Sequence, residues 1–238
     1  HEISTPLGVA TTGSSYLLKQ IKRIKKSMYE AKLSKMDLVN FIKKAEEVSE
    51  TLENNLLRAI ELIKSFKQVS VDQSNLNIRT FSFKKYIYEI IINLKQELKK
   101  IDNEIIVDSP ENLNLLSIPG IFSQIITNFI MNSIIHGYIE GNKLIINIKV
   151  KIVEDEILIT YSDNGKGIEN ENIPKIFDSF FTTNRENGGS GLGLNIVYDL
   201  VTQELGGKID CESEIHKGTK FTITFKKSDK INWIFIET

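Results

Sequence analysis

The sequence predicts an α+β protein: an N-terminal two-helix hairpin that dimerises into a four-helix bundle, followed by an α/β sandwich with a mixed, mostly antiparallel sheet. Residues 1–73 carry a seven-residue apolar repeat without strand alternation, whereas residues 76–228 interleave strand-like and helix-like segments and hold most of the glycines. The polar stretch 71–75 is interpreted as the joint. We therefore expect domains at 1–73 and 76–228, and a tail at 229–238 to which the sequence assigns no role.

Composition excludes several function classes. The 238 residues carry 30 Lys+Arg and 31 Asp+Glu, a formal net charge of −1, so no basic footprint for nucleic acid or an anionic membrane is present. The single cysteine, Cys211, cannot form an intramolecular disulfide, which favours a reducing, cytoplasmic compartment. No stretch approaches the ~18 apolar residues of a membrane span, so we expect any anchor to lie upstream of His1.

The first half predicts two long helices with apolar seams. Ser34 followed by Asp37 is expected to cap the second helix, because a serine hydroxyl can accept a free backbone N–H. Two helices cannot bury a seam on both flanks, so a homodimer forming a four-helix bundle is the simplest completion. The seam residues are Ile3, Leu7, Ala10, Leu17, Ile21, Ile24, Met28 and Ala31 in the first helix, and Leu38, Phe41, Ala45, Val48, Leu52, Ala59, Leu62, Phe66 and Val69 in the second.

Two polar residues interrupt this seam. A turn near Leu33 sets Ser14 against Asn55, and a buried polar layer of this kind would fix the register of the bundle. The alternative, equally weighted, is that Asn55 points to water.

The second half predicts alternating elements, with tight hairpins such as that at 153–156 favouring antiparallel neighbours. Strands are expected at 77–83, 104–108, 143–153, 156–162, 208–213 and 220–225, and helices at 84–100, 119–136 and 192–204. For the apolar end 231–236, an added strand or packed tail is favoured over a binding site.

A histidine opens the first helix. His1 and Thr5 lie four residues apart and share a solvent face, and Glu2 beside the imidazole could orient the ring and accept its proton. Taken alone, the pattern also fits an exposed histidine at a frayed helix end.

The helix at 119–136 is almost wholly apolar except for one stripe of polar residues four apart: Gln124, Asn128, Asn132 and His136. Buried amides need partners, and an asparagine oxygen is a suitable ligand for Mg²⁺ held between protein and phosphates. A stripe that faces solvent is the alternative.

Two glycine-rich loops flank an aromatic stretch. Asp163, Gly165 and Gly167 follow a strand directly, an arrangement that lets backbone approach a flat ligand but also fits a plain turn. Residues 188–194 lead into a helix and offer N–H groups to phosphate oxygens, with a flexible hinge as the alternative. Between them, Phe177, Phe180 and Phe181 bracket a polar flap in which Arg185 could reach a phosphate.

Taken together and in this order, these motifs resemble the catalytic core of a sensor histidine kinase over nearly the whole chain. His1-Glu2-x-x-Thr5-Pro6 is similar to the phosphoacceptor box, and Asn128-x-x-x-Asn132 to the N box. The glycine boxes are matched by Asp163-x-Gly165-x-Gly167 and Gly189-x-Gly191-x-Gly193, and the F box by Phe177-x-x-Phe180-Phe181. The resemblance implies a dimerisation and histidine-phosphotransfer domain followed by a GHKL-type ATP-binding domain.

The resemblance also implies roles for individual residues. His1 would be the phosphoacceptor, Glu2 its base, and Thr5 a residue that positions water during dephosphorylation of a response regulator. Asn132 would coordinate Mg²⁺ with help from Asn128, and Asp163 would accept a hydrogen bond from the adenine amino group. Contacts to ATP are implied for Asn128, Asn132, His136, Asp163, Gly165, Gly167, Ile168, Phe177, Arg185, Gly189, Ser190, Gly191, Leu192, Gly193, Leu194 and Thr219.

We expect a kinase that moves the γ-phosphoryl group of ATP to His1 and then to an aspartate of a response regulator receiver domain. Two departures stand out: Ile135 occupies a position where many members carry Lys or Arg, which shifts the phosphate contact to His136 or Arg185, and the phosphoacceptor helix begins at His1, where fraying is expected. The alternatives are an ATP-gated regulatory or chaperone-like protein of the same fold, and a degenerate kinase acting mainly as a phosphatase through Thr5.

Overall fold

The computed structural model describes residues 4–73, 78–184, 189–226 and 231–235. The chain divides into two compact units, of which the first holds residues up to Lys67 together with 183–190 and the second holds 68–182 and 191–238. Three of the expected site residues, His1, Glu2 and Arg185, lie outside the described residues.

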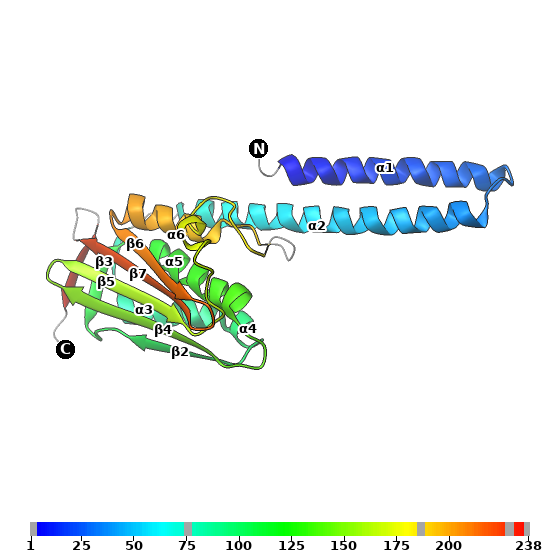
Figure 1. Cartoon of the computed structure of the whole chain (residues 1–238). Helices are drawn as coiled ribbons and strands as arrows, with labels where there is room; N and C mark the ends of the chain where they lie inside the picture. The colour runs from blue at the N-terminus through cyan, green and yellow to red at the C-terminus, as the bar shows by residue number, and fades with distance from the viewer. Residues whose placement is uncertain (1–3, 74–77, 185–188, 227–230, 236–238) are drawn as a thin grey trace. The chain divides into compact units, whose positions relative to one another are not determined.

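The first unit is built on a helical hairpin of α1 (Ser4–Tyr29) and α2 (Lys35–Gln73), which run side by side in Figure 1. The cap expected at Ser34 is confirmed, since the Asp37 N–H donates to Ser34 Oγ over 3.0 Å. In return, the Ser34 N–H donates to Asp37 Oδ2 over 3.2 Å, which completes a reciprocal capping box. These bonds hold the pKa of Asp37 below its ordinary value.

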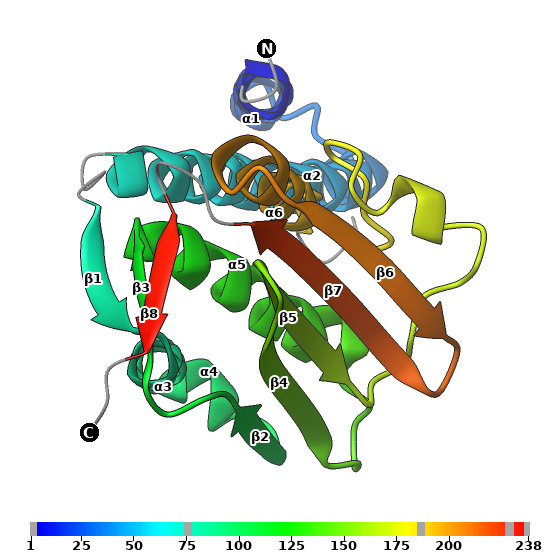
Figure 2. The same ribbon diagram turned by 90° about the vertical axis from the view of Figure 1, so that its left-hand side faces the viewer.

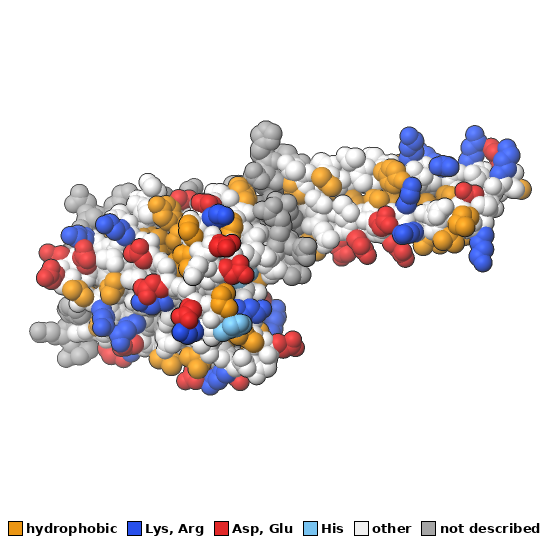
Figure 3. Space-filling view, viewed as in Figure 1, with side chains coloured by type: hydrophobic (Ala, Val, Ile, Leu, Met, Phe, Trp, Pro, Cys, Tyr) orange, Lys and Arg blue, Asp and Glu red, His pale blue; other side chains and the backbone are white. Residues whose placement is uncertain are grey.

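The seam of the hairpin is only partly covered within one chain. Ala10 and Ala59 are buried, and Gly13 lies so that a Cβ there would contact Val48 and Leu52 at 3.4 Å. The other described seam residues are half-buried or exposed, and the large exposed ones are Leu7, Ile21, Met28 and Leu38. Figure 3 shows apolar side chains gathered along the hairpin. The helices therefore keep an apolar face without a cover from the described residues.

The polar layer that pairs Ser14 with Asn55 does not form in this hairpin. Ser14 is exposed, and the half-buried Asn55 donates from Nδ2 to the Thr51 carbonyl of its own helix over 2.8 Å. An amide that bonds to the preceding turn needs no partner across the seam. Gly13, rather than Ser14, faces α2, and the residues that it faces are Val48 and Leu52 instead of Asn55.

The second unit is an α/β sandwich, and Figure 2 shows helices on one side of a twisted sheet. Its strands are β1 (Arg79–Ser82), β2 (Asn103–Asp108), β3 (Leu113–Ser117), β4 (Leu144–Val153), β5 (Glu156–Asp163), β6 (Lys208–Glu214), β7 (Gly218–Lys226) and β8 (Asn232–Phe235). Its helices are α3 (Phe83–Asn93), α4 (Lys95–Leu98), α5 (Pro119–Asn132), α6 (Gly193–Asp199), the π-helical turns η1 (Ser133–Gly137) and η3 (Leu200–Glu204), and the 3₁₀ turn η2 (Ile173–Lys175).

Among the described residues, the strands form two sheets. The larger has the order β2-β4-β5-β7-β6, in which β2 and β4 are parallel and the other pairs antiparallel. The smaller has the order β1-β3-β8 and is antiparallel. The expected fold class, α+β with a mixed and mostly antiparallel sheet, is confirmed.

Strand alternation places the core on the helical side of the large sheet. Along β5, Ile157, Ile159 and Tyr161 are fully buried, and Asp163 continues the same side of the strand at its end. Phe129 of α5 stacks on Phe221 of β7, with ring centroids 4.5 Å apart and planes 11° from parallel. This packing fixes α5 against the strands that end at the candidate site.

Several elements differ from expectation. The helix expected at 84–100 breaks at Leu94, and those expected at 119–136 and 192–204 each finish as a π-helical turn. The strand β3 was not expected, and β8 pairs with it, so the apolar end near 231–235 forms an added strand.

Cys211 lies half-buried on β6, where burial, followed by the charges of Asp163 and Glu212, raises the pKa of its thiol to about 12. Within the described ranges, no helix is long and apolar enough to cross a membrane.

Candidate nucleotide-binding site

The site centres on Asp163, where β5 ends. Its Oδ1 accepts the backbone N–H of Gly165 over 2.9 Å and the N–H of Thr219 over 3.3 Å. Its Oδ2 accepts the hydroxyl of Ser133 over 2.6 Å. Three segments that are distant in sequence thus meet on one carboxylate.

Behind Asp163 lies a second hydroxyl. Ser133 Oγ and Tyr161 Oη are 2.8 Å apart, and the two side chains are 2% and 0% exposed. Ser133 begins η1, directly after Asn132, and Tyr161 precedes Asp163 by two residues, so the strand period turns both toward α5.

Close backbone approaches require glycine at several positions here, and Gly165 and Gly218 are two of them. A Cβ on Gly165 would lie 2.6 Å from the Gly137 carbonyl oxygen at the end of η1. A Cβ on Gly218 would lie 1.9 Å from the Asp163 carbonyl oxygen, and Gly218 also has a φ of +98°, which L-residues rarely adopt. At both positions a side chain larger than hydrogen would clash with the backbone of a neighbouring segment.

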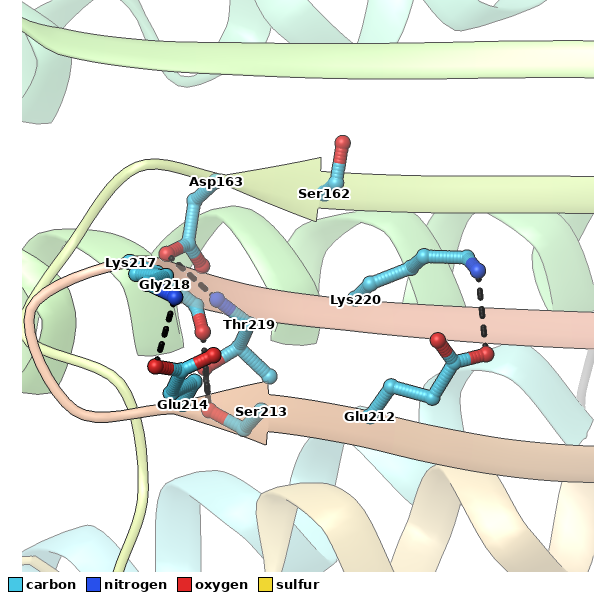
Figure 4. Close-up of a pocket in the computed structure, with 9 residues that line it drawn as sticks. All are labelled: Ser162, Asp163, Glu212, Ser213, Glu214, Lys217, Gly218, Thr219 and Lys220. Carbon is cyan, nitrogen blue, oxygen red and sulfur yellow. Dashed lines mark hydrogen bonds and ion pairs between the residues drawn. The ribbon is translucent and has the colours of Figure 1, made fainter.

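Thr219 and its neighbours form the other wall of this region. Thr219 is buried, and its Oγ1 lies 3.0 Å from Ser213 Oγ. The Ser213 hydroxyl donates to the Gly218 carbonyl over 2.8 Å and accepts the Ile168 N–H over 2.8 Å. Figure 4 shows Asp163, Thr219 and Ser213 at one end of an open hollow of about 420 Å³. The hollow is lined by Ser162, Asp163, Glu212, Ser213, Glu214, Lys217, Gly218, Thr219 and Lys220.

The amide stripe on α5 faces the start of α6. Asn128 donates from Nδ2 to the Gln124 carbonyl over 2.9 Å, which leaves its Oδ1 for another partner. A Cβ on Gly193 would lie 2.9 Å from Asn128 Oδ1 and 3.8 Å from Asn132 Oδ1. The first turn of α6 therefore lies directly against both asparagines.

The aromatic stretch is tied to the second glycine loop. The Phe180 N–H donates to the Gly191 carbonyl over 2.9 Å, and Asn195 Nδ2 in α6 donates to the Phe177 carbonyl over 3.1 Å. Phe177 packs against Tyr198 with ring centroids 5.5 Å apart. Residues Gly191, Leu192, Gly193 and Leu194 are half-buried around this junction. Gly189 and Ser190 belong to the first unit, where the Gly189 N–H donates to the Asn184 carbonyl.

His136 lies half-buried at the end of η1. Burial, helped by the charge of Lys166, lowers its pKa below the ordinary value for histidine. The neutral imidazole is therefore the favoured form near pH 7, which makes His136 a poor source of positive charge.

The donor set fits a magnesium nucleotide. Asn132 Nδ2 is buried and has no hydrogen-bond partner among the described residues, and Gln124 Nε2 is in the same state. A buried amide hydrogen without a partner suits a phosphate oxygen, and the amide oxygens are hard ligands of the kind Mg²⁺ prefers. A side chain at position 193 would have to displace the amide oxygen of Asn128.

Comparison with known proteins gives the family. Residues 119–229 match the family of histidine kinase-, DNA gyrase B-, and HSP90-like ATPases. The signal transduction histidine-protein kinase ArlS of Staphylococcus aureus is 31% identical over 176 residues, which is 72% of this chain and 38% of ArlS. The catalytic domain of the histidine kinase ThkA aligns with a TM-score of 0.54 and 26% identity over 63% of this chain and 96% of that domain. This chain carries a sensor histidine kinase core.

The kinase core spans about 38% of the length of the curated relatives that it matches. The fold extends across the hairpin as well, since the histidine kinase AdeS of Acinetobacter baumannii covers 91% of this chain with a TM-score of 0.51 at 18% identity. The resemblance inferred from the five motifs is thereby confirmed, and the ATPase domain implies ATP as the nucleotide.

The structure of the kinase core brings together most, not all, of the expected residues. Asp163, Gly165 and Thr219 meet directly, Gly167 and Ile168 lie on the adjoining loop, and Asn128 and Asn132 face Gly193. Thr5 is exposed in the first turn of α1, in the other unit. Sequence reasoning missed Ser133, Tyr161 and Ser213. The two-residue spacing of Tyr161 and Asp163 on one strand face was the one available signal.

Proposed function

We propose that this chain is the catalytic core of a two-component kinase that transfers the γ-phosphoryl group of ATP to His1. In that reaction the bond from phosphorus to the bridging oxygen of ADP breaks, and a bond from phosphorus to an imidazole nitrogen forms. Glu2 accepts the ring proton. The phosphoryl group then passes to an aspartate carboxylate on a response regulator.

The observation that carries the proposal is the cradle at Asp163. A carboxylate fixed by Ser133, Gly165 and Thr219 is an oriented acceptor in a region lined by close backbone, which suits the amino edge of adenine. Gly167, Ile168 and Thr219 would enclose the base.

The phosphate end would be held by the elements around Asn128 and Asn132. Their amides, the unpaired Nδ2 of Asn132 and the N–H groups of Gly191 and Gly193 would contact a triphosphate. Phe177 and Arg185, from the sequence between the two glycine loops, would add further contacts. Mg²⁺ bound at Asn132, with Asn128 assisting, would neutralise phosphate charge. His136 would contribute hydrogen bonding rather than charge.

Three further assignments complete the proposal. The exposed seam of α1 and α2 would close a homodimer as a four-helix bundle. A receiver domain is the partner, and Thr5 would position water when the same core dephosphorylates that regulator.

The test is incubation with γ-labelled ATP and Mg²⁺, followed by acid or base. We expect label that survives base and is lost in acid, which is the behaviour of phosphohistidine. His1→Gln should abolish the label, whereas His216→Gln, an exposed histidine in the turn before β7, should keep it.

Label retained in His1→Gln would overturn the phosphoacceptor assignment. An intact chain that binds and slowly hydrolyses ATP without acquiring acid-labile phosphate would instead favour the ATP-gated regulatory function. Unchanged ATP affinity in Asp163→Ala would remove the adenine contact.

A further inference from the structure

Asp163 is supported from behind by a chain of two buried hydroxyl groups. Tyr161 Oη lies 2.8 Å from Ser133 Oγ, and Ser133 Oγ lies 2.6 Å from Asp163 Oδ2. Tyr161 is fully buried and Ser133 is 2% exposed, so bulk water does not compete for either group.

The direction of the hydrogen bonds follows from counting hydrogens. A serine hydroxyl has one hydrogen, and Ser133 donates it to the carboxylate of Asp163. Ser133 can then take part in its bond with Tyr161 only as acceptor, so Tyr161 is the donor. Burial, the largest influence, raises the pKa of Tyr161 well above its ordinary value, which keeps this hydrogen on the phenol.

The opposite side of the carboxylate is fixed by backbone. Asp163 Oδ1 accepts N–H groups from Gly165, in the loop after β5, and from Thr219, at the start of β7. A carboxylate with donors on both oxygens can neither offer a hydrogen nor rotate freely about its χ2 bond. Its remaining acceptor capacity on Oδ2 points in one fixed direction.

We propose that Tyr161 and Ser133 are positioning residues that lock Asp163 as a pure acceptor and so make the site choose 6-amino purines over 6-oxo purines. The inference rests on the proposed contact between Asp163 and adenine. Adenine presents a donor at C6, whereas hypoxanthine presents an acceptor there and moves its donor to N1. A carboxylate free to swing could follow the donor to N1, and a locked one cannot.

The experiment compares the affinities for ATP and inosine triphosphate, each with Mg²⁺. The two ligands share the same triphosphate, so any disturbance of Asn132, the neighbour of Ser133, cancels in the ratio of dissociation constants. We expect the unchanged chain to prefer ATP. Loss of a hydrogen bond to a charged group should lower that preference about tenfold in Ser133→Ala, and loss of the more distant phenol about threefold in Tyr161→Phe.

Ser109→Ala is the matched control. Ser109 is also a buried serine of the second unit, and its hydroxyl has no hydrogen-bond partner among the described residues. Its removal should leave the ATP preference unchanged. A merely structural effect would lower the melting temperature and weaken both nucleotides equally, without moving the ratio.

An unchanged ratio in a folded Ser133→Ala protein overturns the proposal. If that variant does not fold, the nearly isosteric Tyr161→Phe decides, and an unchanged ratio there overturns it as well. Asp163→Asn separates this inference from the proposed function. If that variant keeps the full ATP preference, Asp163 does not contact adenine and both proposals are overturned. If Asp163→Asn loses the preference while Ser133→Ala leaves the ratio unchanged, only the role of the two hydroxyl groups is overturned.

Discussion

Single residues around Asp163 leave little room for side chains, and Gly218 shows the cost of adding one. Gly218→Ala would place a Cβ 1.9 Å from the Asp163 carbonyl oxygen at a φ of +98°. We expect a loss of about 2–4 kcal/mol in the free energy of unfolding, or roughly 5–15 °C in melting temperature. Thermal unfolding followed by circular dichroism measures this.

The control for Gly218 is Gly206→Ala. Gly206 also has a positive φ, +60°, but no atom lies within 4 Å of the position that an added methyl group would take, so only the backbone strain remains, about 1 kcal/mol. Equal losses in the two variants would show that the close approach to Asp163 does not matter.

The lowered pKa of His136 makes the stability of the fold depend on pH. Its pKa is lowered in the folded state, so the unfolded chain binds more protons as the pH falls through the ordinary histidine range. Stability should therefore decrease below about pH 6.5. His136→Gln should flatten the dependence of the melting temperature on pH between pH 7 and pH 5.5. A steeper fall in His136→Gln than in the unchanged chain would contradict the assignment.

The sequence predicted those site residues whose spacing within a single helix or strand marks them. Asn128 and Asn132 share a helix face because they are four residues apart, and Asp163 stands out at a strand end. Ser133 and Tyr161 were not predicted, since their meeting depends on how α5 packs on β5. A hydrogen bond between side chains of two different elements depends on tertiary packing, which the local sequence pattern does not reveal.

At the scale of elements, the start of α2 depends on its capping box. Ser34→Ala should cost about 1 kcal/mol, because the Asp37 N–H loses its acceptor and the Asp37 carboxylate loses one of its two donors. We expect a lower melting temperature in the helical circular-dichroism signal. Ser15→Ala, an exposed serine in the middle of α1, should have no such effect. Equal changes in the two variants would mean that the box contributes nothing.

Element types were predicted better than element ends. The periods of 3.6 and 2 identified the helices and most strands. They did not predict that the helices around α5 and α6 finish in the π-helical turns η1 and η3, because a change from i→i+4 to i→i+5 bonding leaves no mark in apolar spacing. Strand β3 escaped notice because short runs gain their structure from pairing, here with β1 and β8, rather than from local preference.

For the whole molecule, the exposed seam of the hairpin predicts self-association. Ile21 lies on the seam and is 49% exposed, so Ile21→Glu should place a charge in the proposed dimer interface and convert the protein to a monomer. Mass measured by light scattering at micromolar concentration checks this. Tyr29→Glu, exposed but off the seam, should remain dimeric. A dimer that survives Ile21→Glu would contradict the bundle.

The chemistry of Cys211 has a practical consequence for fluorescent labelling of the protein. With a thiol pKa of about 12, only about one molecule in ten thousand carries the reactive thiolate at pH 8. Since this is the chain's single cysteine, thiol-directed dyes should largely spare the native sequence. A fluorescent reporter on a cysteine introduced at an exposed place such as Ser15 could therefore be attached without first removing Cys211.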